Sequence, residues 1–143
     1  MRRYHTLRRV LIVLLLLSFV MAACGDDTTA TTGGQDVVFG EGEIPATVPA
    51  DFPVPDTGII GSTMIDRVHH RTEFSLQMAV DLTTVAQFFE VELVNRGYVV
   101  TSSAALSAQL WRIEFSQGEL AGEVTINSLS AALSQAVVTL NVA

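Results

Sequence analysis

Two segments of the chain show a clear alternation of apolar and polar side chains. In residues 73–80 the large apolar side chains occupy every second position, and polar or small ones lie between them. In residues 110–115, Trp111, Ile113 and Phe115 alternate with positions that include Arg112 and Glu114. A period of two is typical of a strand with one buried face. The pattern therefore predicts a strand in each segment.

Between these two segments the apolar spacing changes to that of a helix. Asp81 is a typical N-cap residue, and Gly97 is typical of the position just after a helix ends. The apolar positions between them recur at intervals of three and four residues: Leu82, Val85, Ala86, Phe89 and Leu93. The sequence predicts a helix of about four turns here.

Weaker strand patterns, rich in β-branched residues, occur at 59–68, 98–101, 124–129 and 136–142. No internal repeat is present. We therefore predict an α+β domain at residues 51–143. About five of these six segments would form an antiparallel sheet with one helix packed on one face, in the order β-β-α-β-β-β.

The N-terminal segment has the order basic, apolar, small. Four arginines lie within residues 1–9, and an apolar run follows at residues 10–23. This run is shorter than the roughly 20 residues that a membrane-spanning helix needs. The order is that of a secretory signal peptide, so residues 1–23 are predicted to be a signal peptide and the remaining chain is predicted to be exported.

Cys24 is the only cysteine of the chain and follows this run directly. The stretch Met21-Ala22-Ala23-Cys24 resembles the lipobox of bacterial lipoproteins. The resemblance implies cleavage between Ala23 and Cys24, acylation of Cys24, and anchoring on the extracytoplasmic side of the cell membrane. A second resemblance, carried by residues 50–55 (Ala-Asp-Phe-Pro-Val-Pro), is to small exported bacterial domains of unassigned function.

Residues 24–50 are rich in Thr, Gly, Asp and Pro, which predicts a flexible tether between the anchor and the domain. Val37-Val38-Phe39 interrupts this composition, and the sequence leaves open whether it docks on the domain as a strand. From Cys24 onward, four arginines and no lysine stand against fifteen carboxylates, a net charge of −11. Such acidity argues against a nucleic-acid partner and predicts that membrane contact is made by the lipid.

One cluster has side chains that bind metals or act as catalytic bases. His69-His70 lies near Asp66 and Glu73, but adjacent strand residues point to opposite faces, so the spacing is poor for a single metal site. No serine stands in a Gly-x-Ser-x-Gly motif. We expect no metal and no other cofactor, and the protein is not expected to be an enzyme. The alternative is a metal-dependent or hydrolytic envelope enzyme that uses His69 and His70.

The sheet face away from the helix is the candidate recognition surface. Its predicted members are Glu73, Ser75, Gln77, Arg112, Glu114, Thr125 and Asn127. Among them Glu73, Gln77, Arg112 and Glu114 are the candidate site residues. The alternative is an ordinary solvated face of the kind that antiparallel sheets allow. On the helix, Val91 and Val94 form an exposed apolar strip that is a candidate contact for a weak homodimer or another partner.

These features together predict a lipid-anchored extracytoplasmic binding or interaction module of the bacterial cell envelope. Its expected contacts are the membrane, through the N-terminal lipid, and an envelope protein or small ligand that the sequence does not identify.

Overall fold

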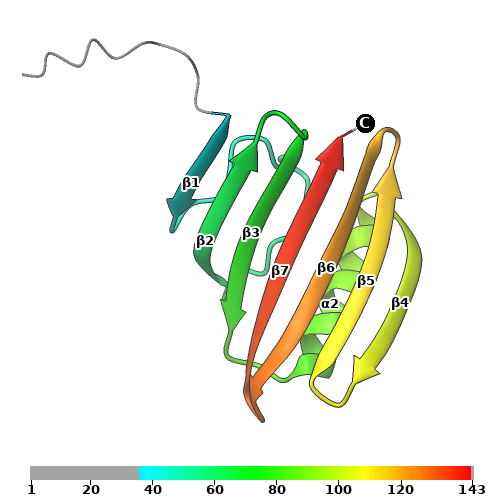
Figure 1. Cartoon of the computed structure of the whole chain (residues 1–143). Coiled ribbons are helices and arrows are strands. Elements are labelled where there is room, and N and C mark those ends of the chain that lie inside the picture. The colour runs from blue at the N-terminus through cyan, green and yellow to red at the C-terminus, as the bar shows by residue number, and fades with distance from the viewer. Residues whose placement is uncertain (1–35, 143) are drawn as a thin grey trace, which may run out of the picture. The chain divides into compact units, whose positions relative to one another are not determined.

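A computed structural model describes residues 36–142 (Figure 1). Seven strands and one helix make up this part of the chain, three strands before the helix and four after it. Their bounds are β1 (Val37–Glu41), β2 (Ile59–Asp66), β3 (Arg71–Met78), α2 (Leu82–Asn95), β4 (Val99–Ser107), β5 (Leu110–Gln117), β6 (Leu120–Ser130) and β7 (Leu133–Val142).

All seven strands form one antiparallel sheet in the order β1-β2-β3-β7-β6-β5-β4. The last strand, β7, is therefore the central one, with β3 and β6 as its neighbours. Helix α2 packs against β4, β5, β6 and β7, and in Figure 1 it lies behind the sheet. One face of the sheet is thus covered, while α2 leaves the opposite face open.

The helix begins and ends as its sequence predicts. The Asp81 carboxylate accepts hydrogen bonds from the backbone N–H groups of Thr83 and Thr84, both at 3.0 Å, and these bonds satisfy donors that the first turn leaves unpaired. They also hold the pKa of Asp81 below its ordinary value, with the Thr84 hydroxyl making the largest contribution. Gly97, at φ +84°, occupies the left-handed conformation that favours glycine and ends the helix.

Phe52 closes the core on the same face of the sheet as α2, beside the helix. This side chain is only 3% exposed, and its ring lies 5.9 Å from that of Phe74 and 5.8 Å from that of Phe115. The rings of Phe89 and Tyr98 are also in contact range, at 6.5 and 5.9 Å. Aromatic pairs at these separations contribute beyond their buried area. The segment before β2 is therefore part of the covering layer, beside the helix.

The predicted sheet of about five strands in the order β-β-α-β-β-β is wrong, because seven strands are present. The error lies mainly in the two edge strands. Strand β1 falls inside the predicted tether, and β4 continues through the Ser/Ala-rich residues 102–107, where every side chain is exposed. An edge strand with exposed side chains has no apolar alternation, and its backbone hydrogen bonds to a neighbour hold it in place.

The folded domain also begins before residue 51, the predicted boundary. Val37-Val38-Phe39 docks as part of β1, where Val38 pairs with Ile65 and Phe39 with Met64 of β2. Val48, also within the predicted tether, is 9% exposed and belongs to the core. No helix in the described residues is long and apolar enough to cross a membrane.

Candidate functional site

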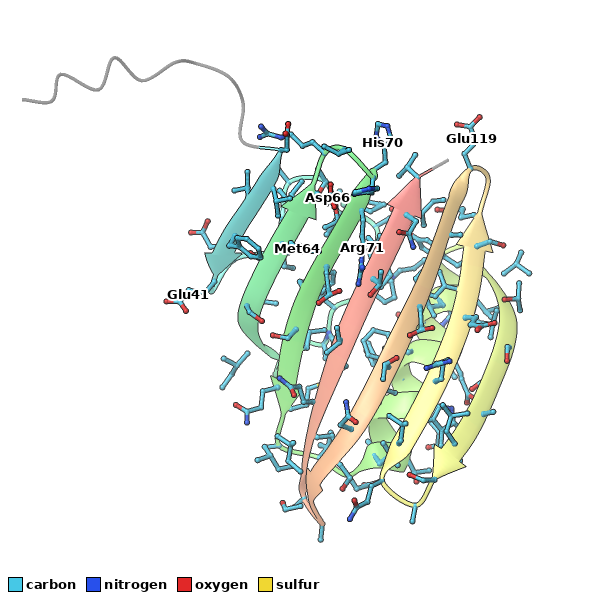
Figure 2. All side chains as sticks on the ribbon, viewed as in Figure 1. Glu41, Met64, Asp66, His70, Arg71 and Glu119 are labelled. Carbon is cyan, nitrogen blue, oxygen red and sulfur yellow. The ribbon has the colours of Figure 1, made fainter. Side chains whose placement is uncertain are left out.

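The sheet face opposite α2, called the open face below, is built by the strand residues that alternate with the core positions. Phe74, Ile113, Val124 and Val138 point into the core and are fully buried, so their neighbours along each strand point outward. On the four strands β3, β7, β6 and β5 the outward positions include Glu73, Ser75, Gln77, Gln135, Val137, Thr139, Glu123, Thr125, Asn127, Leu110, Arg112 and Glu114. Figure 2 views the sheet from this side.

Charged residues dominate one row across the open face. Glu73 pairs in register with Thr139, Thr139 with Glu123, and Glu123 with Glu114. Two arginines offset part of this charge: Arg71 forms an ion pair with Glu73, and the Arg112 Nε lies 3.3 Å from Glu123 Oε2. Glu114 has no ion-pair partner in the described part of the chain, and it directly faces the like charge of Glu123.

A second row carries neutral amides. Gln77 pairs with Gln135, and Gln135 pairs with Asn127, which places three amide side chains on neighbouring strands, called the amide row below. At one end of this row Gln77 pairs with Ile59 of β2, and at the other end Asn127 pairs with Leu110 of β5. The hydrogen bonds of the described residues include none from these three amide groups. The amide row therefore offers donors and acceptors to a partner.

The charged row ends at an apolar pair on the edge of the sheet. Glu73 pairs with Met64 of β2, and Met64 pairs with Phe39 of β1, so these side chains share the open face. Phe39 is 76% exposed, and Met64 is half-buried. Figure 2 labels Met64 on β2, beside β1. We call Phe39 and Met64 the apolar corner of the open face.

The four candidate recognition residues all lie on the open face, two on each of two strands. Glu73 and Gln77 belong to β3, while Arg112 and Glu114 belong to β5. Strands β7 and β6 lie between them, so the two pairs are about 14 Å apart, or three strand spacings. They share a surface without forming one compact site, and Arg112 is already occupied by Glu123.

Sequence reasoning missed several residues between those two pairs. Gln135 and Glu123 precede the strands that were predicted to start at residues 136 and 124, whereas β7 starts at Leu133 and β6 at Leu120. The apolar corner was missed because β1 was assigned to the tether. The signal that would have found Gln135 and Glu123 is the alternation itself, extended toward the N-terminal end of each strand.

His69 and His70 lie in the turn between β2 and β3, and they point to different surroundings. The Nδ1 atom of His69 is 2.7 Å from Asp66 Oδ2, and this hydrogen bond is the main reason that the pKa of Asp66 is lowered. His70 has φ +51°, and its carbonyl oxygen accepts a hydrogen bond from the backbone N–H of Val142. The described residues contain no cluster of three metal-binding side chains. The enzyme alternative built on the two histidines stays a prediction.

A cavity of about 440 Å³ opens beside this turn, and we call it the hairpin-end cavity. Its apolar wall comes from Ile65, Leu140 and Val142, its cationic side chains are Arg67 and Arg71, and His70 also lines it. Two threonines, Thr47 and Thr72, also line it, together with Asp66. Figure 2 shows Asp66, His70 and Arg71 together at the hairpin end of β2 and β3.

The remaining predicted sites are the apolar strip of α2 and the cleavage and lipid-attachment residues. Val91 and Val94 of α2 are 56% and 59% exposed, so the predicted apolar strip is accessible, and the homodimer remains a prediction. Ala23 and Cys24, the predicted cleavage and lipid-attachment sites, lie outside the described residues. Comparison with protein-family models, with curated proteins and with solved structures finds no match.

Proposed function

We propose that the protein is a lipid-anchored, extracytoplasmic interaction module of the bacterial cell envelope that binds a protein partner through the open face. The observation that carries this proposal is the exposure of Phe39, at 76%, beside Met64 and a polar face that α2 leaves uncovered. Aromatic residues and methionine are enriched at the centres of protein interfaces. An exposed aromatic ring on a largely polar sheet face is costly in water and favours a partner that covers it.

The size of the open face supports a protein partner. Seven strands spaced by about 4.8 Å, each with about eight residues that rise 3.4 Å apiece, give a face of about 29 by 27 Å. This corresponds to nearly 800 Å², about the area that one partner contributes to a standard protein–protein interface. The amide row would supply hydrogen bonds within such an interface, and the apolar corner would supply its aromatic contact.

The proposed anchor would keep this face close to the membrane. Eleven residues lie between Cys24 and Asp36, and a fully extended chain of that length spans at most about 40 Å. An acyl group on Cys24 would therefore restrict the domain to a thin layer next to the lipid surface. Because this restriction raises the effective concentration of membrane-associated partners, a modest intrinsic affinity would be sufficient.

The first test is capture of a partner from native membranes after mild cross-linking, with three variants of the tagged full-length protein. Phe39→Ser removes the aromatic ring from the apolar corner, and Val137→Arg places a bulky cation on the central strand of the open face. Val94→Ser is the matched control, because it removes an exposed apolar side chain from α2. Thermal unfolding verifies that each variant is folded.

The proposal predicts that Phe39→Ser and Val137→Arg lose the partner while Val94→Ser retains it. Equal capture by all four proteins would exclude the open face, and loss only in Val94→Ser would move the interface to α2. A Cys24→Ser form tests the anchor separately. The proposed anchor requires that this form leaves the membrane fraction, and retention there would contradict acylation at Cys24.

A further inference from the structure

The hairpin-end cavity has an apolar wall built from two strands, β2 and β7, with Thr72 of β3 between them. Ile65 of β2 and Leu140 of β7 both point to the side of the sheet that carries the core, and Val142 extends this surface at the end of β7. The segment before β2 also lines the cavity, and its Thr47 Oγ1 lies 2.6 Å from the Thr72 Oγ1 of β3. A chain of methylene groups in this cavity would be removed from water.

The cationic side of the cavity stands out against the rest of the domain. Residues 36–142 contain thirteen carboxylates, no lysine and four arginines, and two of the four, Arg67 and Arg71, line this cavity. His70 lies between them in the sequence and also lines it. Guanidinium groups bind carboxylates and phosphates through charge-assisted hydrogen bonds. The composition of this cavity therefore favours an anion in a protein that otherwise repels anions.

The carboxylates near the cavity are engaged by neighbouring groups. Asp66 accepts hydrogen bonds from the backbone N–H groups of Val68 and His69, both at 3.0 Å, in addition to its contact with the His69 ring. Glu73 is paired with Arg71 on the open-face side of β3. The Arg71 side chain remains 44% exposed in that pair.

We propose that the hairpin-end cavity binds an amphiphile with an acidic headgroup and an aliphatic chain. The headgroup lies against Arg67 and Arg71, and the chain lies along Ile65, Leu140 and Val142. A volume of about 440 Å³ falls within the range of small-molecule sites, about 300–1,000 Å³. Two sources share this chemistry, a free fatty acid and a membrane phospholipid. The proposal depends neither on the open face nor on acylation of Cys24.

The test uses residues 35–143, which form one compact unit that contains all seven strands, the helix and the core. Decanoate, decanol and inorganic phosphate are titrated separately into this protein, and the backbone amide signals are followed by NMR. Dihexanoyl phosphatidate represents the phospholipid source. Decanol keeps the chain without the charge, and inorganic phosphate keeps the charge without the chain.

We expect decanoate or dihexanoyl phosphatidate to shift signals of the cavity residues, and the tighter of the two identifies the source. Decanol should bind about tenfold more weakly, because it forms no charge-assisted hydrogen bond to an arginine. Inorganic phosphate alone should bind more weakly still. No shift at the cavity with either charged amphiphile would overturn the proposal, and equal binding of decanol would overturn the role of the arginines.

Two variants and one control locate the binding. Arg71→Gln should weaken decanoate binding about tenfold, and Val142→Asp should abolish it by placing a carboxylate on the apolar wall. The matched control is Arg112→Gln, since Arg112 has the same side-chain exposure, 44%, and also pairs with a glutamate, but lies on β5 and does not line the cavity. An equal loss in Arg112→Gln would show that the effect is one of overall charge and would contradict a site in this cavity.

Discussion

Gly122 of β6 is the position at which one added methyl group should damage the core most directly. Gly122 pairs with Phe115 of β5, and the Phe115 ring folds across the glycine backbone. A Cβ atom at residue 122 would lie 2.6 Å from Cε2 and 3.0 Å from Cε1 of this ring, and closer still to its Cζ. Contacts of that length do not occur between carbon atoms, which are in optimal contact near 3.5–4.0 Å, so Gly122→Ala requires the ring to move.

The Phe115 ring has no free space into which it can move. It is 2% exposed, and the rings of Phe52 and Tyr98 lie 5.8 and 5.6 Å away. Overpacking of this kind costs about 1–3 kcal/mol. Replacing glycine by alanine restores about 0.4–1 kcal/mol through the unfolded chain. The net loss is therefore about 1–2 kcal/mol, which lowers the Tm of a domain of this size by about 5–10 °C.

The assay is thermal unfolding of four proteins: the wild type, Gly122→Ala, Phe115→Leu and the double variant. Phe115→Leu removes the ring atoms that the new methyl group would strike, although it destabilises the core by itself. Gly122→Ala should therefore be nearly neutral, or slightly stabilising, in the Phe115→Leu background. The same loss of Tm in both backgrounds would refute this account of the contact.

Two further substitutions test the polar groups. The Tyr98 hydroxyl is buried without a hydrogen-bond partner in the described part of the chain, and burial, followed by the negative charge of Asp51, raises its pKa. Tyr98→Phe should therefore leave Tm unchanged or raise it in thermal unfolding, whereas a clear decrease would reveal a bond to the hydroxyl. Asp66→Asn removes the negative charge and the second carboxylate oxygen, the one in contact with the His69 ring, so Tm should fall at neutral pH. The folded-state pKa of Asp66 lies below 3.8, so this contribution is present above pH 3.8 and is lost as the pH falls through the folded pKa. Thermal unfolding at a series of pH values should show the difference from the wild type closing in acid, and a constant difference would contradict the assignment.

The parts of the fold that sequence could predict are those with one buried side. The helix prediction is confirmed, since α2 spans Leu82–Asn95 with Asp81 as its N-cap. Alternation likewise located β3 and β5, because their core residues Phe74 and Ile113 are fully buried. In these segments the side-chain pattern reflects burial directly, so local sequence was sufficient.

The edge strands could not be predicted in the same way. Strand β1 has a single half-buried residue, Val38, and β4 has only Val100. Their position depends on backbone pairing with β2 and β5, and the pairing of Val37 with Asp66 joins residues far apart in the sequence. Such pairing leaves little trace in the order of apolar and polar residues.

The candidate sites show the same contrast between residues placed by a local pattern and residues brought together from distant segments. Alternation alone was enough to put Glu73 and Arg112 on one face, because each belongs to a strand with a buried side. The hairpin-end cavity brings together Thr47, Arg67 and Leu140, which come from three separate segments. No local pattern connects such residues, so the cavity emerges only from the folded chain.

The central claim, that the open face meets a protein partner, is tested most directly by photo-cross-linking in cells that produce the protein. A benzoylphenylalanine is placed at residue 39 in one strain and at residue 94 in another, since Phe39 lies on the open face and Val94 on α2. The account predicts that light gives a cross-linked protein of one size from residue 39 and none from residue 94. Cross-links from residue 94 alone would contradict it, as would their absence from residue 39.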